Sequence, residues 1–270
     1  MTMRTTTTRA LGAVGLTVAL ASSALAQAPE APETPQAPAA PSWKYSVTPI
    51  AIWAMSIKGP ITVRNRTQEV DASFSDLFDH LQGSFGLGAT AVKGRFGAFL
   101  NLSYLKIGQD NVGTLPPTDV SLKWFTGELG GTYAAYTGPE VTVSVLAGAR
   151  YVGLKGEIDA VDETFTFHSK TINWWDPFIG AQVAKPFGNK FAIAVKGDVG
   201  GFDISNSTSK LTWSVTPTAS YRFPMSGGSW SLIVSGGYRF TSIDFTGDGP
   251  DVFQMDVDMK GPTLGLTATF

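Results

Sequence analysis

The ten residues from Gly261 to Phe270, GPTLGLTATF, constrain the fold of this chain more than any other segment. In an extended chain, successive side chains point to opposite faces. One face of this segment would therefore be small and polar, and the other would be apolar, with Pro262, Leu264, Leu266, Ala268 and Phe270. Because the segment ends on an aromatic residue with an uncovered apolar face, we expect lipid rather than protein to cover that face.

The same alternation recurs from Trp43 onward. Short turns follow Val92, Tyr136, Lys185 and Phe223, whereas the other connections are mostly longer and more polar. This pattern is typical of outer-membrane barrels. We predict an all-β fold, a transmembrane antiparallel up-and-down β-barrel of about ten strands, with eight or twelve strands as alternatives. The predicted strands are 43–55, 84–92, 96–107, 121–136, 141–155, 169–185, 191–204, 211–223, 230–245 and 261–270.

In the first predicted strand, strict alternation puts every second residue on the lipid-facing side. The aromatic residues on that side lie near both ends, as expected for two interfacial belts. The side chains concerned are Trp43, Tyr45, Val47, Pro49, Ala51, Trp53 and Met55.

Composition supports a membrane barrel and excludes several other classes. Charged residues make up 16% of the chain, below the roughly 25% of soluble domains. The net charge of −2 indicates no nucleic-acid partner. The chain has no cysteine, which excludes disulfides and thiolate metal sites. No stretch is apolar for the ~20 residues that a transmembrane helix needs.

The N-terminal region carries the pattern of a secreted protein. Arg4 and Arg9 precede an apolar, small-residue run, so residues 1–26 are predicted to be a cleavable signal peptide. Residues 27–42 are rich in proline and alanine, and proline recurs at every third position from Pro29 to Pro41. We interpret them as a periplasmic leader, with an extended spacer or partner ligand as the alternative. The barrel is predicted to span residues 43–270.

The first long connection, residues 58–82, contains a predicted short helix. Phe74, Leu77, Phe78 and Leu81 have helical spacing, and Ser73 is a suitable N-cap with Asp76 three residues later. We expect the apolar face of this helix to be buried in the barrel mouth or on its rim.

Five motifs after residue 42 carry a further signal: TPIAIWAMSIKG from Thr48, DASFSDLFDHL from Asp71, AGARY from Ala147, WWDPFIGAQV from Trp174 and GGYRF from Gly236. They are similar to motifs of a family of predicted outer-membrane β-barrel proteins of unassigned activity, and the similarity spans most of the chain after residue 42. The resemblance implies a barrel in the outer membrane and no reaction. One departure is Asn101, where such strands often carry an inward acidic residue.

Inward-facing charges form the candidate site. Alternation directs Glu128, Arg150, Asp176, Lys196, Asp198, Arg222 and Arg239 into the lumen. In a barrel of about ten strands these charges would be enclosed and would have to pair. We therefore predict a polar network that plugs the lumen and a structural or surface-interaction role, with a narrow path for ions or small solutes as the alternative.

Catalytic residues are scarce in this sequence. Its two histidines are His80 and His168, and Asp79 precedes His80. A membrane-embedded hydrolase, omptin-like or lipid A-modifying, is a second alternative, although the second acidic pair or the positioned serine that such mechanisms need is not evident. We predict no enzymatic activity and no cofactor. The acids Asp244, Asp248, Asp251, Asp256 and Asp258 do not match a calcium-binding loop, and no metal site is predicted.

These features also predict the surroundings of the protein. We expect a monomer in the outer membrane, in contact with lipid and lipopolysaccharide and with no nucleic acid. The terminal strand ending at Phe270 is the expected contact with the barrel assembly machinery.

Overall fold

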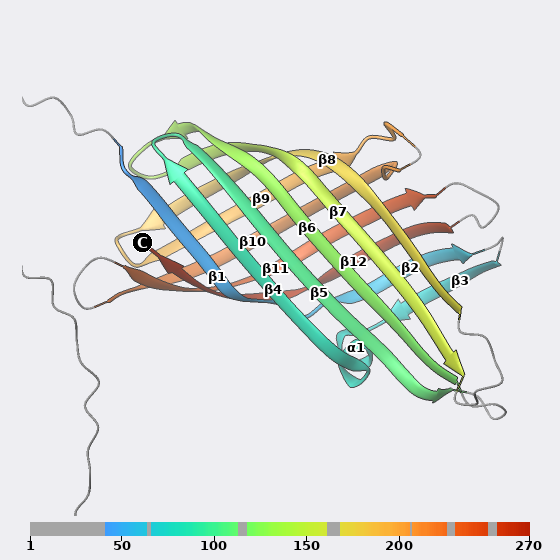
Figure 1. Cartoon of the computed structure of the whole chain (residues 1–270). Coiled ribbons are helices and arrows are strands. Elements are labelled where there is room, and N and C mark those ends of the chain that lie inside the picture. Colours follow the sequence, from blue (N-terminus) through green and yellow to red (C-terminus); the bar gives the residue numbers. More distant parts are fainter. Residues whose placement is uncertain are drawn as a thin grey trace, which may run out of the picture. The chain divides into compact units, whose positions relative to one another are not determined.

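The structure, a computed structural model, describes residues 41–63, 66–112, 118–160, 168–205, 207–225, 230–247 and 253–270. The predicted signal peptide and almost all of the predicted leader lie outside these residues. Figure 1 shows the strands and the short helix α1. The elements are β1 (Trp43–Trp53), β2 (Ser56–Val63), β3 (Arg66–Ala72), α1 (Phe74–Asp79), β4 (Leu81–Lys93), β5 (Phe96–Val112), β6 (Thr118–Thr137), β7 (Thr142–Ala160), β8 (His168–Phe187), β9 (Phe191–Gly201), β10 (Leu211–Pro224), β11 (Ser231–Thr246) and β12 (Phe253–Thr269).

The strands pair in chain order and close on themselves. The sheet runs β1, then β4 through β12, and β12 pairs again with β1. Every pairing is antiparallel, and Tyr45 and Phe270 exchange backbone hydrogen bonds of 3.1 and 2.8 Å at the seam. Ten strands therefore form a closed up-and-down barrel, which confirms the predicted fold class. The hairpin of β2 and β3 adds two further strands beside β12.

Aromatic side chains form two belts on the outer wall. At the end with the short turns, exposed aromatics include Trp43, Phe96, Tyr133, Phe187, Phe191, Tyr221 and Phe223; toward the other end they include Phe85, Trp175, Trp213, Tyr238 and Phe240. On β10 the two belts are represented by Trp213 and Phe223, and ten residues at ~3.3 Å each span about 23 Å when tilted by ~45°. This matches the ~25 Å apolar band of outer-membrane barrels.

The first strand departs from the predicted strict alternation. Pairing with β12 slips between Val47 and Ile50, where β1 carries one more residue than its partner. A β-bulge of this kind reverses the faces beyond it. Consequently Ile50 and Ile52 are exposed, whereas Trp53 and Met55 pack against the apolar cluster inside the barrel. The prediction that Ala51, Trp53 and Met55 face lipid was wrong.

Two strand ends also differ from the predictions. The last strand begins at Phe253 rather than Gly261. The strand predicted to reach residue 204 ends at Gly201, because Gly201, Phe202 and Asp203 have φ of 87°, 65° and 49°, which an extended strand cannot accommodate.

Toward the end opposite the short turns the barrel wall becomes two facing layers (Figure 1). The pairing of β1 with β4 stops at Thr48 and Gly88, and that of β8 with β9 stops at Phe178 and Gly200. Above these points β4–β8 form one layer, and β11, β12, β2 and β3 form the other. We call this part the head. A buried apolar cluster fills it: Trp124, Val152, Leu154, Trp174, Ile243, Phe245, Phe253, Met255, Val257 and Met259.

Helix α1 forms at the predicted N-cap, but Leu81, which was predicted to continue the helix, begins β4, and the helix does not bury its apolar face. The Ser73 hydroxyl accepts a hydrogen bond from the Asp76 amide, and the Asp76 carboxylate accepts one from the Ser73 amide, which completes a capping box. Phe74 and Phe78 contact each other at 5.6 Å between ring centroids, yet remain 45% and 58% exposed. In the described part of the chain, α1 therefore does not plug the barrel mouth. No helix among these residues is long and apolar enough to cross a membrane.

Candidate functional site: a charged network in the lumen

Three buried charges from three strands form the centre of the lumen. Glu128 on β6 lies directly opposite Arg150 on β7, and Arg150 Nε donates to Glu128 Oε1 at 2.8 Å. Arg150 Nη2 donates to Asp198 Oδ1 on β9 at 2.6 Å. Arg150 is only 3% exposed. One guanidinium thus links two carboxylates, which is the pairing that enclosed charges require.

Glycine at position 180 allows Arg150 to reach across β8. Gly180 lies between Leu146 of β7 and Asp198 of β9 in the sheet register. A Cβ atom at Gly180 would lie 2.9 Å from Cβ of Asp198 and 2.3 Å from the Gly197 carbonyl oxygen. A larger residue there would therefore displace the Asp198 carboxylate from its partner.

Further polar side chains surround the Glu128 carboxylate. Arg239 Nη2 and Lys196 Nζ lie 3.7 and 3.9 Å from its oxygens, and Asn101 Nδ2 donates to Glu128 Oε2 at 3.2 Å. The amide of Asn101 thus fills the place where the resemblance implied an acid. Ser214 Oγ donates to Asp198 at 3.1 Å. The sequence did not predict two members of this network: Asn101, which acts as a hydrogen-bond donor, and Ser214, whose hydroxyl faces inward from β10.

Each cation of the network also lies over an aromatic ring. Arg150 is 5.1 Å from the centroid of Phe178, Lys196 is 5.2 Å from that of Phe99, and Arg239 is 4.9 Å from that of Trp53. Such contacts stabilise a cation that has lost water. The network is therefore packed against apolar side chains, and the apolar cluster of the head lies above it.

Asp176 has a different role from the one predicted. It lies opposite Arg150 in the register, but its hydrogen bonds come from the Ser209 amide at 2.7 Å, the Ser209 hydroxyl at 2.8 Å and Trp174 Nε1 at 3.1 Å. Ser209 belongs to the connection between β9 and β10 and is completely buried. Asp176 therefore anchors this connection to β8.

Arg222 lies outside the network. It is exposed near the short-turn end of β10, opposite Ile233 of β11. Of the seven predicted lumen residues, the structure brings five together, Glu128, Arg150, Lys196, Asp198 and Arg239, and leaves Asp176 and Arg222 with other surroundings. Alternation indicates which face a residue occupies, but not its depth or its partner.

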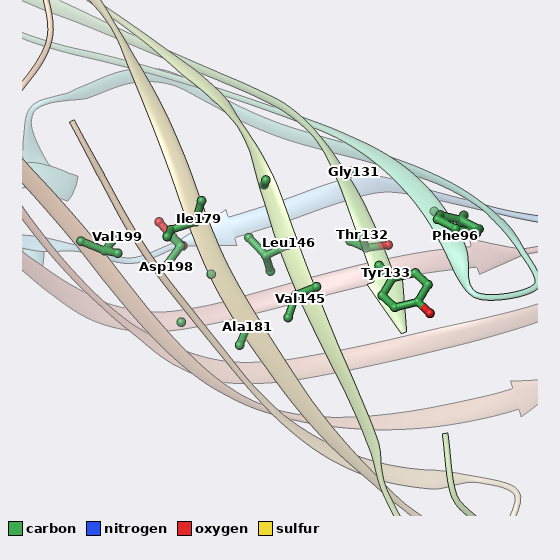
Figure 2. A pocket seen from close by; sticks show the side chains of 14 residues that line it. Phe96, Gly131, Thr132, Tyr133, Val145, Leu146, Ile179, Ala181, Asp198 and Val199 are labelled. Carbon is green, nitrogen blue, oxygen red and sulfur yellow. The ribbon is translucent and has the colours of Figure 1, made fainter. Parts of the chain in front are cut away.

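The outer wall also has a shallow apolar depression of about 840 Å³ across β5–β9 (Figure 2). Small outward-facing residues line it, among them Gly131, Ala147, Ala181 and Gly197, together with Tyr133 and Ile179. It lies on the side of the wall assigned to lipid, so acyl chains are its natural occupants.

Catalytic geometry is not evident in the described residues. The Nδ1 atom of His80 lies 2.8 Å from the Asp76 carbonyl oxygen, as part of the end of α1, and within the described ranges no serine hydroxyl or Asp79 carboxylate hydrogen-bonds to its ring. The side chain of His168 lies outside the description. No group of three His, Asp or Glu side chains among the described residues is placed to hold a metal ion; Asp248 and Asp251 lie outside them.

No protein-family model and no curated protein matches this chain. Among solved structures, the outer membrane protease OmpT from Escherichia coli is similar with 11% identity and a TM-score of 0.42, over 84% of this chain and 96% of that one. Ail, the attachment invasion locus protein of Yersinia pestis, solved with the heparin analogue sucrose octasulfate, has 10% identity and a TM-score of 0.36, over 84% and 97%. A FadL homologue from Pseudomonas aeruginosa has 10% identity and a TM-score of 0.30, over 84% and 90%.

At these low identities and TM-scores, neither proteolysis nor ligand binding is inferred for this chain from these structures. The barrel is established by its own closed strand pairing. The specific family indicated by the sequence motifs stays a prediction.

Proposed function

We propose that this protein is a monomeric outer-membrane β-barrel with a closed lumen and a structural or surface-binding role. The observation that carries this proposal is the filling of the lumen by the Glu128–Arg150–Asp198 network and, above it, by the apolar cluster of the head. An aqueous path would have to displace paired charges from aromatic partners and then cross a layer of packed apolar side chains. Both steps are energetically unfavourable.

The two aromatic belts and the apolar band between them support the location. The short-turn end, where Trp43 and Phe270 lie, would face the periplasm, and the head would face outward. A simple measurement tests this: purified protein without the predicted signal peptide should need detergent or lipid to stay folded and monodisperse. Folding as a stable water-soluble monomer would overturn the proposed location.

Planar-bilayer recording tests the closed lumen. We expect the inserted protein to give no steady single-channel current under conditions in which an open porin conducts. Insertion would be verified separately by protease protection of the barrel in the same lipid. Steady currents from the unmodified protein would contradict a closed lumen.

A narrow path for ions is the second candidate, and one observation favours it. The side chains of Lys196 and Arg239 keep 29% and 28% of their exposure within the lumen. If the protein conducts, and if Arg239→Gln changes the conductance while Arg222→Gln does not, the lumen network would be a selectivity element instead of a plug.

A further inference from the structure

Between the charged network and the short-turn end, the lumen is lined by small polar side chains that water reaches. These residues face inward, yet they are half-buried instead of buried: Thr132, Ser144, Gln182, Thr216, Thr218, Ser235, Thr263 and Thr267. Side chains packed against protein on all sides would be buried, so the space between these residues holds water. We call this space the vestibule. Nearer the short turns, Thr90 and Arg222 also occupy inward positions and are exposed, so the vestibule opens at that end.

Of the charges in the network, the two that water reaches are cations. The side chains of Lys196 and Arg239 are 29% and 28% exposed. The other three members are only 6%, 4% and 1% exposed: Glu128, Arg150 and Asp198. The remaining acid, Asp176, is bound by Ser209 and does not join the network. Three cations and two carboxylates leave one net positive charge, and the vestibule meets this charge with its carboxylates hidden.

Lys196 and Arg239 lie in one row of the wall, on either side of Thr216. Thr216 of β10 is opposite Lys196 of β9, and the uninterrupted register of β10 with β11 places it opposite Arg239. Two interstrand steps separate the backbones of the two cations by about 10 Å. Their charged ends lie 3.9 and 3.7 Å from oxygens of one carboxylate, that of Glu128. These distances are too long for hydrogen bonds, so donors of both cations remain available to the vestibule.

One row nearer the short turns, two hydroxyl groups converge on Gly237. Thr218 of β10 and Thr263 of β12 are opposite Gly237 on its two sides. A Cβ atom at position 237 would lie 3.0 Å from the Oγ1 atom of each threonine. Among the described residues, neither hydroxyl has a hydrogen-bond partner. Glycine therefore keeps open a small space that two free hydroxyls face, two residues along β11 from Arg239.

We propose that the inner end of the vestibule binds a small oxyanion of the phosphate class. Lys196 and Arg239 supply the positive charge, and Thr218 and Thr263 supply neutral donors one row away. A planar guanidinium and a compact ammonium both bind phosphate oxygens well. The buried Glu128 carboxylate holds the two cations from behind. The proposal rests on the closed lumen of the proposed function, because an anion that enters from the short-turn end then meets the network and is retained.

Calorimetric titration of the folded protein in uncharged detergent, with inorganic phosphate as the probe, tests the site. The double variant Lys196→Gln, Arg239→Gln should bind phosphate at least about tenfold more weakly, as expected for the loss of charge-assisted hydrogen bonds. The matched control, Lys93→Gln, Arg95→Gln, removes the same two charges from exposed positions at the β4–β5 turn and should change binding by less than about twofold. Trimethyl phosphate, which carries no charge, should not bind to the unmodified protein. Equal binding by both double variants, or binding of the neutral ester, would overturn the proposal.

A second double variant tests the hydroxyl groups without changing charge. Thr218→Val, Thr263→Val keeps the shape of both side chains and should weaken phosphate binding about threefold to tenfold. Circular dichroism of each variant verifies that the barrel is folded. Unchanged binding would overturn the assignment of the site to the space beside Gly237.

A single cysteine measures the potential of the vestibule with Lys196 and Arg239 in place. The chain has no cysteine, and Ser235 is the next inward residue from Gly237 toward the short turns. Relative to a free thiol, Ser235→Cys should react at least about tenfold faster with an anionic methanethiosulfonate than with a cationic one, and phosphate should slow the anionic reaction. Equal relative rates, or no effect of phosphate, would overturn the proposal. Steady single-channel currents from a protein that still binds phosphate would instead contradict the closed lumen.

Discussion

The membrane-embedded part of the barrel and the head are built from the same strands with opposite chemistry. On β12, odd-numbered residues face inward along the whole strand. In the head the inward residues are Phe253, Met255, Val257 and Met259, and the outward residues are Gln254, Asp256, Asp258 and Lys260. From Pro262 onward the outward residues are apolar and the inward ones are threonine or glycine.

The same positions therefore face inward along all of β12, but between Lys260 and Pro262 the outward residues change from polar to apolar and the inward residues from apolar to small or polar. Because the backbone geometry is unchanged, we attribute this reversal to a change of surroundings. In the head the strand has water outside and packed protein inside; nearer Phe270 it has lipid outside and a polar lumen inside. The same change from an apolar to a charged outward residue occurs on β5, between Tyr104 and Lys106.

The largest effect is expected where a buried charge loses its partner. Arg150→Leu would leave Glu128 and Asp198 without their shared guanidinium, and we expect a loss of roughly 3–5 kcal/mol in the free energy of unfolding. Urea unfolding in detergent measures this loss. Arg222→Leu is the control, because Arg222 is exposed and outside the network, and should change stability by less than ~0.5 kcal/mol. Equal effects would mean that the lumen charges are solvated.

Adjacent tryptophans on β8 separate the head core from the lipid-facing belt. Trp174 is fully buried and stacks on Phe245 at 4.1 Å between centroids, whereas Trp175 points outward and is 57% exposed. Trp174→Ala should cost about 3–5 kcal/mol and speed hydrogen exchange of β11 and β12 amides in the head. Trp175→Ala should leave that exchange unchanged. If Trp174→Ala leaves it unchanged too, the two layers of the head are not packed together.

Arginine substitutions on β12 test the reversal of polarity directly. Leu264 is 53% exposed on the lipid side, and Leu264→Arg should destabilise the inserted barrel by about 2–4 kcal/mol. Gln254→Arg, on the same face of the same strand but in the head, should change stability by less than ~0.5 kcal/mol. Reversible unfolding from lipid vesicles gives both values. Similar costs at both positions would place the boundary elsewhere.

The smallest effect concerns the pH dependence of the head surface. Hydrogen bonds from Lys123 and Lys155 lower the pKa of Glu157 from its usual 4.5 to about 2. The resulting stabilisation is complete above pH 4.5 and is lost as pH falls through about 2. Thermal melts of the protein and of Glu157→Gln should therefore differ near neutral pH and converge near pH 2. Glu140→Gln removes one exposed pair with Lys185 at 3.7 Å and should show little difference at either pH. A constant difference between the unmodified protein and Glu157→Gln would show that the lysines do not hold this carboxylate.

Sequence reasoning succeeded where side-chain alternation and turn chemistry carry the information. The barrel, the strand count, the positions of the short turns and the capped helix at Ser73 all follow from local patterns. It failed at the bulge between Val47 and Ile50, because an extra residue in one strand is defined only by the partner strand. It also placed Asp176 in the charged lumen network, whereas Ser209 binds it from a connection 33 residues away in the chain.

The sequence by itself therefore determined that these strands must form a barrel with an apolar exterior, because a period of two and the placement of turns are properties of adjacent residues. Only the tertiary structure decided that Arg150 bridges Glu128 and Asp198 and that the head folds as two layers around Trp174. These outcomes depend on strand register and on where β9 and β10 stop. Register couples residues far apart in the chain, and no local pattern encodes it.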